Sequence, residues 1–307
     1  MISNLVQTKQ IIKILKLIGV TACILMILSF SAMAQKAEET IQKELSFSND
    51  AQNPVFFLAN INGHIEVEGY DGATIQLEAK KQISAKTEAR LQKGKEEISV
   101  GVMELTDSIV VFIDGPCGGL TRNNYSKNKR KHQGWGYNWN NCRFDYDFVV
   151  DFNIKVPKNV NLRLSTINRG DINVDNTHGN LVLNNINGSI SLNKVSGQTD
   201  VHTINGDVDI TYTKNPEVES KYYTLNGDIN AHYQKGLAAD ITFKTFNGDF
   251  FTNLSDLKQQ TLIEKKEHSR GNGISYKIDG RSLMRARNGG VRLNFETFNG
   301  DVYVKEN

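Results

Sequence analysis

The segment 115–145 gathers the side chains whose types suggest ligand chemistry. It is rich in Lys and Arg, and no Asp or Glu lies between Pro116 and Phe144. Cationic side chains hold phosphates and carboxylates, whereas aromatic faces stack on sugars or bases. We therefore expect a binding loop for an anionic polymer, and the competing interpretation is a solvated basic loop whose rings cover the end of the core. The expected contact residues are Arg130, Lys131, Trp135, Tyr137 and Trp139.

Of the three cysteines of the chain, Cys23 lies in the first 34 residues, and Cys117 and Cys142 stand near the two ends of this segment. If the first 34 residues are removed on export, the remaining even number of cysteines favours a disulfide over two free thiols. Closing a loop of this length contributes roughly 3 kcal/mol in the chain-entropy model. Together with His132 the pair matches no standard zinc spacing, so we expect neither a metal nor another cofactor.

The first 34 residues have the pattern of an export signal. Lys residues precede an apolar run over 17–30, and Ala32-Met33-Ala34 is a small-x-small cleavage signal. Cleavage after Ala34 and lipidation at Cys23 remain alternatives. Either way the chain is expected in the periplasm or on the outer cell surface, with the membrane contacted only through this leader.

The overall charge is nearly balanced, with 36 Lys+Arg and 34 Asp+Glu, so bulk charge does not favour nucleic acid as a partner. No Ser/His/Asp spacing, nucleophile elbow or phosphate loop is present. The sequence thus predicts a protein that is not an enzyme. The alternative is a carbohydrate-active β-helix enzyme acting on an envelope or extracellular polysaccharide, because distant coils can bring acids together on one face.

A repeat organises the second half of the chain. Glycines stand at 170, 179, 188, 197 and 206, a constant spacing of nine, and apolar residues alternate with polar ones between them. Alternation with period two is typical of a strand with one buried face. Two corner types alternate, so one coil has about 18 residues, and later coils lengthen to about 21. This pattern predicts an all-β, single-chain β-solenoid with parallel strands. The stacked coils are expected to bury Leu181, Leu183, Ile190, Leu192, Val201, Ile204, Val208 and Ile210.

Most corners of one type read Asn-Gly-Asp. Asn-Gly suits the left-handed backbone of a tight corner, so we expect positive φ there. Each Asp is expected to accept corner backbone N–H bonds, which is a simpler role than binding calcium. The predicted corner residues are Asn187, Gly188, Asn205, Gly206, Asp207, Asn226, Gly227, Asp228, Asn247, Gly248, Asp249, Asn299, Gly300 and Asp301.

Repeated Asn-Gly-Asp corners behind a signal peptide resemble the bacterial "putative adhesin" family, a domain of unknown function. The resemblance implies a β-solenoid, an envelope location and no enzyme activity. The expected organisation is a leader over 1–34, an N-terminal β segment over 35–114 with one short helix from Ser84 to about Glu97, the basic-aromatic insertion over 115–145, and a solenoid over 146–307 with a polar insertion at about 255–290. The expected function is adhesin-like binding or scaffolding, with an anionic envelope polysaccharide or another envelope protein as partner.

Overall fold

The computed structural model of the chain describes residues 35–116, 120–122, 135–137, 143–260, 263–266, 275–278 and 282–307. The leader, both flanking cysteines, Arg130, Lys131 and Trp139 lie outside these residues. In the part described, no helix is long and apolar enough to cross a membrane.

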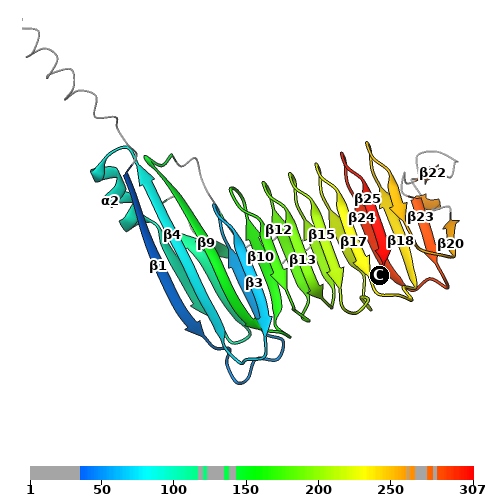
Figure 1. Cartoon of the computed structure of the whole chain (residues 1–307), viewed down its shortest axis with the longest axis horizontal. Coiled ribbons are helices and arrows are strands. Elements are labelled where there is room, and N and C mark those ends of the chain that lie inside the picture. Colours follow the sequence, from blue (N-terminus) through cyan, green and yellow to red (C-terminus); the bar gives the residue numbers. More distant parts are fainter. Residues whose placement is uncertain are drawn as a thin grey trace, which may run out of the picture.

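The chain is mostly β, with two large sheets that face each other along an elongated stack (Figure 1). The ten-stranded sheet has the order β1 (Gln35–Leu45), β4 (Ile75–Ala85), β9 (Tyr146–Pro157), β3 (Ile65–Tyr70), β11 (Ile172–Asp175), β13 (Ile190–Val195), β15 (Val208–Tyr212), β17 (Ile229–Tyr233), β25 (Val302–Glu306) and β19 (Phe250–Thr252). The eleven-stranded sheet has the order β20 (Leu257–Gln260), β23 (Ser282–Ala286), β18 (Ala239–Lys244), β24 (Val291–Glu296), β16 (Ser220–Tyr223), β14 (Thr199–His202), β12 (Leu181–Asn185), β10 (Asn161–Thr166), β2 (Val55–Ala59), β6 (Ser108–Asp114) and β5 (Ser99–Glu104).

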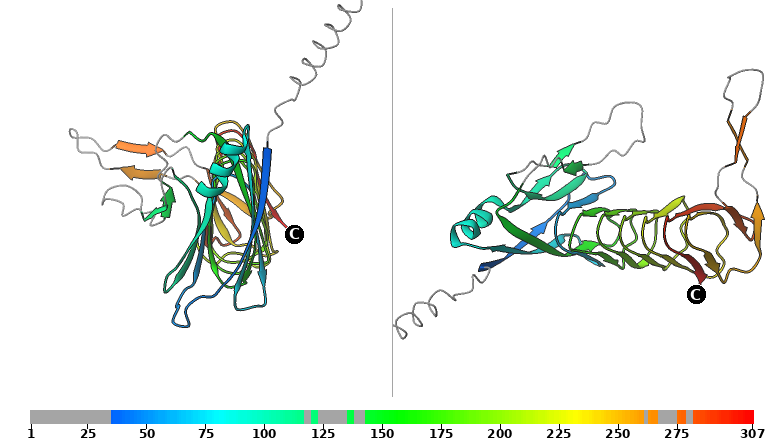
Figure 2. Two further views of the ribbon diagram at one scale, coloured as in Figure 1. Left: turned by 90° about the vertical axis from the view of Figure 1, so that its left-hand side faces the viewer. Right: turned by 90° about the horizontal axis from the view of Figure 1, so that it is seen from above.

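Two hairpins form small sheets of their own. One pairs β7 (Leu120–Arg122) with β8 (Trp135–Tyr137), and the other pairs β21 (Ile263–Lys266) with β22 (Ser275–Ile278). Figure 2 shows both hairpins projecting from the same side of the stack. Neither hairpin is hydrogen-bonded as a strand to the large sheets, so both can be altered without breaking the strand pairing of the stack.

From β10 to β17, successive strands fall in alternate sheets and pair in parallel with the second strand along the chain. Leu181 pairs with Thr199, and Ile190 pairs with Val208, which are steps of 18 residues. Val208 pairs with Ile229, a step of 21. The period predicted from the glycine spacing is therefore confirmed. We call one strand from each sheet, with the corner between them, a rung.

The apolar rows point between the two sheets, as the alternation predicted. Seven of the eight side chains expected in the core are buried: Leu181, Leu183, Ile190, Leu192, Val201, Val208 and Ile210. The eighth prediction, Ile204, was wrong because this residue lies at the corner and is only half-buried. Antiparallel strands bound both ends of the stack, where β4 pairs with β1 and β9 and where β23 pairs with β18 and β20.

The last rung of the chain is not the last rung of the stack. Strand β25 lies between β17 and β19, and β24 lies between β16 and β18, so the C-terminal rung is inserted before the rung that precedes it in sequence. The segment at about 255–290 is the excursion that makes this return possible. That segment was expected to be a polar insertion, and it contributes β20 and β23 to the large sheet.

The single helix described, α2 (Glu88–Glu97), begins later than expected because Ser84 belongs to β4. The Thr87 side chain accepts the N–H of Arg90 at the helix start. Buried Lys81 donates to two backbone carbonyls at the helix end, at 3.0 and 3.3 Å, and its ammonium lies 2.7 Å from Glu39. Lys81 of β4 therefore connects the C-terminal end of the helix with β1.

Three tyrosines fill the core where the rungs lengthen. Tyr212, Tyr222 and Tyr233 are fully buried, and the rings of Tyr212 and Tyr233 stack at 5.1 Å. Their hydroxyls satisfy one another, at 2.6 Å between Tyr212 and Tyr222 and 3.1 Å between Tyr233 and Tyr222. A wider rung needs larger side chains, and this network supplies them without leaving a buried polar atom unpaired.

These tyrosines make the stack sensitive to alkali. Burial raises the pKa of Tyr212, Tyr222 and Tyr233 above the ordinary value of 10.0. Above pH 10 the unfolded chain releases these protons while the folded chain keeps them, so stability is retained below pH 10 and falls above it. The loss reaches about 4 kcal/mol per pH unit for three groups. Urea unfolding at pH 8 to 11 measures this slope, Tyr222→Phe should make it shallower, and a flat profile would contradict the network.

Candidate functional site

The Asn-Gly-Asp corners lie above one another along one edge of the stack. Their Asn side chains form a continuous amide ladder, in which each Nδ2 donates to the Oδ1 of the preceding rung at 2.7 to 2.9 Å. In spatial order the ladder contains Asn168, Asn187, Asn205, Asn226, Asn299 and Asn247. These amides are therefore committed to holding neighbouring rungs in register.

The aspartates form a second ladder beside the amides. Asp207 accepts the backbone N–H of Asp228, Asp228 accepts that of Asp301, and Asp301 accepts that of Asp249, all at 2.8 Å. The expected role of these residues as backbone acceptors is confirmed for the first three. Within the described residues, no group of three or more His, Cys, Asp or Glu is placed to hold a metal ion.

The corner glycines are required by close approach more than by backbone angle. Gly227 and Gly248 have φ of 153° and 155°, but Gly188 and Gly206 are not among the glycines with positive φ, so the prediction of positive φ was only half right. A Cβ built on Gly206 would lie 2.2 Å from the carbonyl oxygen of Gly188 in the rung below. No side chain fits between two backbones this close.

A third ladder was missed by the sequence argument. The residue three before each corner Gly is usually a buried Thr, whose hydroxyl donates to the carbonyl of the Gly in the preceding rung. Thr203 reaches Gly188 at 2.9 Å, and Thr224 reaches Gly206 at 2.8 Å. The signal was present as Thr-x-Asn-Gly-Asp, since the Thr recurs at a fixed offset from each glycine. It was not recognised because Thr also fits an ordinary strand position.

The residue between this Thr and the Asn points outward and forms an apolar edge. Ile186, Phe298 and Phe246 are 39%, 44% and 74% exposed, whereas Ile167, Ile204 and Leu225 are half-buried. The rings of Phe298 and Phe246 stack at 4.8 Å. The apolar edge consists of Ile167, Ile186, Ile204, Leu225, Phe298 and Phe246. Exposed apolar side chains thus lie beside a line of amides along this edge of the stack.

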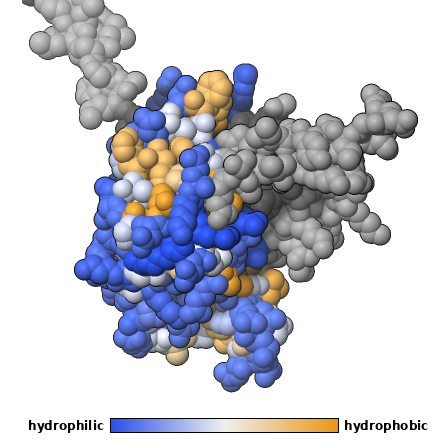
Figure 3. All heavy atoms as spheres, turned by 90° about the vertical axis from the view of Figure 1, so that its right-hand side faces the viewer, coloured by the Kyte–Doolittle hydropathy of each residue, from blue (hydrophilic) through white to orange (hydrophobic). Residues whose placement is uncertain are grey.

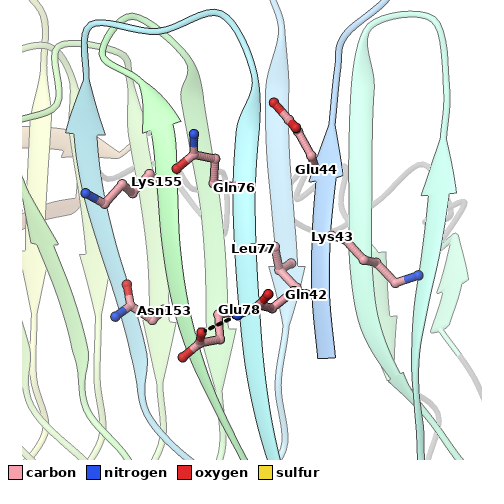
Figure 4. A pocket seen from close by; sticks show the side chains of 8 residues that line it. All are labelled: Gln42, Lys43, Glu44, Gln76, Leu77, Glu78, Asn153 and Lys155. Atoms are coloured by element: carbon pink, nitrogen blue, oxygen red, sulfur yellow. Dashed lines mark hydrogen bonds between the residues drawn. The ribbon is translucent and has the colours of Figure 1, made fainter. Parts of the chain in front are cut away.

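A shallow hollow of about 480 Å³ lies over β1, β4 and β9 on the outer face of the ten-stranded sheet (Figure 4). Gln42 and Glu78 point toward one another there, with a hydrogen bond of 2.9 Å that lowers the pKa of the Glu78 carboxyl. The remaining lining residues are Lys43, Glu44, Gln76, Leu77, Asn153 and Lys155. Their charges have mixed sign, which is typical of a solvated sheet face.

The segment 115–145 is described in part only. Leu120 pairs with Tyr137 and Arg122 pairs with Trp135 in antiparallel register, so the chain folds back on itself within the segment. The backbone pairing thus places Trp135 and Tyr137 on the same short strand. The Cys117–Cys142 disulfide and the contact role of the basic residues remain predictions, because these residues lie outside the described part.

Comparison with known proteins gives a family and distant structural neighbours. A "putative cell adhesion protein" from Clostridium sporogenes is 12% identical with a TM-score of 0.41, and the match covers 90% of this chain and 100% of that chain. A "putative adhesin" from Bacteroides fragilis is 9% identical with a TM-score of 0.30, over 88% of this chain and 97% of that one. No curated protein matches the chain.

The neighbour names say nothing about what this chain binds, because the TM-scores are low. The family match is more informative. The model described as Toastrack DUF4097 matches residues 153–279, which run from within β9 to just beyond β22. This match confirms the resemblance inferred from the repeated corners. Residues 153–279 of the chain are therefore similar to the Toastrack DUF4097 family.

Proposed function

We propose that the chain is a non-enzymatic envelope protein in which a β-solenoid with coils of about 18 to 21 residues serves as a rigid scaffold for binding. The proposal rests on one observation: the repeated polar side chains are used in hydrogen bonds that join neighbouring rungs. Asn205 and Asp207 bind the neighbouring rungs, and Thr203 binds a glycine carbonyl inside the corner. Side chains used in this way stabilise a shape.

The basic-aromatic segment 115–145 is the proposed binding element, with an anionic envelope polysaccharide as ligand. Five cations and no acid fall within 118–141, together with both tryptophans of the chain. The hairpin of β7 and β8 supports this proposal because it stands apart from the large sheets. A Cys117–Cys142 disulfide would order the segment before binding, which reduces the entropy lost on complex formation.

The predicted export signal is consistent with this proposal, which places the mature chain in the periplasm or on the outer cell surface. The proposed organisation is a leader over 1–34, an N-terminal β segment over 35–114, the binding segment over 115–145, and the solenoid over 146–307. We assign the excursion at about 255–290 to the proposed solenoid, and the place of β20 and β23 in the eleven-stranded sheet supports this assignment.

An array of glycans and lipopolysaccharides probed with the mature protein tests this function. Binding is expected for anionic polymers and not for neutral ones, with a steep decrease on adding salt because Lys and Arg carry the attraction. The combined variant K129E, R130E and K131E should lose this binding, whereas charge reversal at exposed Lys235 should not. Shortening of any polymer during incubation would instead indicate the enzyme alternative.

A further inference from the structure

The two edge strands of the ten-stranded sheet differ in the side chains that they carry. At one end, β1 carries charged side chains along its length, which include Glu38, Glu39, Lys43 and Glu44. Charges on an edge strand discourage pairing with another chain. At the other end the edge strand is β19, whose three residues are Phe250, Phe251 and Thr252. In the part of the chain that the structure describes, no strand pairs with the outer side of β19.

The pleat of β19 determines which backbone groups face outward. The N–H of Val302 in β25 donates to the carbonyl of Asp249 at 2.9 Å, so the backbone groups of Asp249 and Phe251 face β25. Backbone groups alternate in direction along a strand. The N–H and C=O groups of Phe250 and Thr252 therefore face away from the sheet, as a template for one more strand.

Exposed aromatic rings accompany this edge. Phe251 is 43% exposed and stacks on Tyr303 of the neighbouring strand, with ring centroids 4.9 Å apart. Phe246, at the corner just before β19, is 74% exposed and is the most exposed large apolar side chain in the described part of the chain. Figure 3 views this end of the molecule and shows apolar surface among hydrophilic residues. Exposed rings beside an unpaired strand edge are typical of an interface.

We propose that β19 pairs with β19 of a second copy of this chain, antiparallel and related by a twofold axis. Because Phe250 and Thr252 present the outward backbone groups, each would exchange hydrogen bonds with the other residue of the second copy. Phe251 would then lie opposite Phe251 as a pair without backbone hydrogen bonds, where side chains come closest. The two stacked pairs of Phe251 and Tyr303 would join into one row of four rings.

The charges at this edge are complementary in the same register. Asp249 would lie opposite Asn253, so no like charges face each other across the twofold axis. Asp249, Phe251 and Asn253 alternate onto one exposed face of the strand, which is the face that carries Tyr303 and Lys305. Asp249 of the second copy would thus stand level with Lys305 of the first. This arrangement adds an attraction that salt weakens.

Sedimentation equilibrium of the mature full chain tests the association. The wild type should form a dimer whose population rises with concentration and falls with salt. Phe251→Asp should raise the dimer dissociation constant at least tenfold, because two carboxylates would meet at the twofold axis. Val218→Asp is the matched control, since Val218 is 50% exposed away from β19 and its change should leave the dimer unaffected. A wild type that stays monomeric at all concentrations would overturn the proposal.

A cysteine scan tests the register. Phe251→Cys should form a disulfide-linked dimer under mild oxidation, because opposite Cβ atoms in an antiparallel pair are about 4.5–5.5 Å apart. Asp249→Cys should not, because two copies of this position would be separated by four residues of strand, roughly 13 Å. The wild type gives the background from Cys117 and Cys142. Equal crosslinking of both variants would mean random collision and would overturn the antiparallel register. These results are independent of polysaccharide binding.

Discussion

Replacing Leu183 by aspartate is expected to unfold the stack of strands. Leu183 is fully buried in the middle of β12, and its register partners are Leu164 in β10 and Val201 in β14. A carboxylate there loses the packing of the leucine and has no partner for its charge, which together cost about 5 kcal/mol or more. That cost is comparable with the whole stability of an ordinary domain. Because each rung is stabilised by its neighbours, the loss should spread along the stack.

The neighbouring residue provides the control for this substitution. Asn184 is exposed on the same strand, so Asn184→Asp introduces the same charge on the solvent side. It should change the free energy of unfolding by less than about 0.5 kcal/mol. Circular dichroism during urea unfolding measures both variants. Similar effects of the two substitutions would mean that Leu183 does not face a dry core.

Gly206→Ala should also destabilise the chain strongly, by about 3 kcal/mol. The cause is the carbonyl oxygen of Gly188, which lies 2.2 Å from the position of the new Cβ and belongs to backbone that cannot rotate away. Two rungs must separate to admit the methyl group. Their separation would also lengthen the hydrogen bonds from Asn205 to Asn187 and from Thr203 to Gly188.

Gly236→Ala is the control for Gly206→Ala, because at Gly236 an added Cβ causes backbone strain without a close contact. Gly236 has a φ of 92°, in the left-handed region, but the nearest atom to its Cβ is a side-chain nitrogen at 3.6 Å. Its substitution should cost about 1 kcal/mol from backbone strain alone. The structure therefore predicts a larger loss at Gly206 than at Gly236. The reverse order, measured by thermal unfolding, would show that backbone angle and not rung contact explains the corner glycines.

The repeat could be predicted from the sequence because each strand and each corner is determined by residues close together in the chain. Glycines nine residues apart, with alternating apolar residues between them, predicted the 18-residue parallel register and the buried rows. The corner aspartates were interpreted correctly because an Asp beside a tight turn commonly accepts hydrogen bonds from nearby backbone N–H groups. Ile204 was misplaced because an apolar residue at a corner looks the same in sequence as one in a strand.

The order of rungs could not be read in this way. Gly300 stacks between Gly227 and Gly248, although it follows both in sequence. All rungs of the Thr-x-Asn-Gly-Asp type offer nearly the same contacts, so the motif does not encode which rung neighbours which. That choice depends on the return path of the chain through β20 and β23, and polar segments of this kind carry no periodic signal.

The most direct test of the scaffold account replaces residues 118–141 by a short Gly-Ser linker and measures binding to an anionic envelope polysaccharide by calorimetry. A matched control replaces 262–279, the hairpin of β21 and β22, which also forms a separate two-stranded sheet. Both variants should keep the wild-type melting temperature, the first should bind at least tenfold more weakly, and the second should bind as the wild type does. Wild-type binding by the first variant would mean that the stack holds the ligand, and the proposed function of residues 118–141 would be wrong.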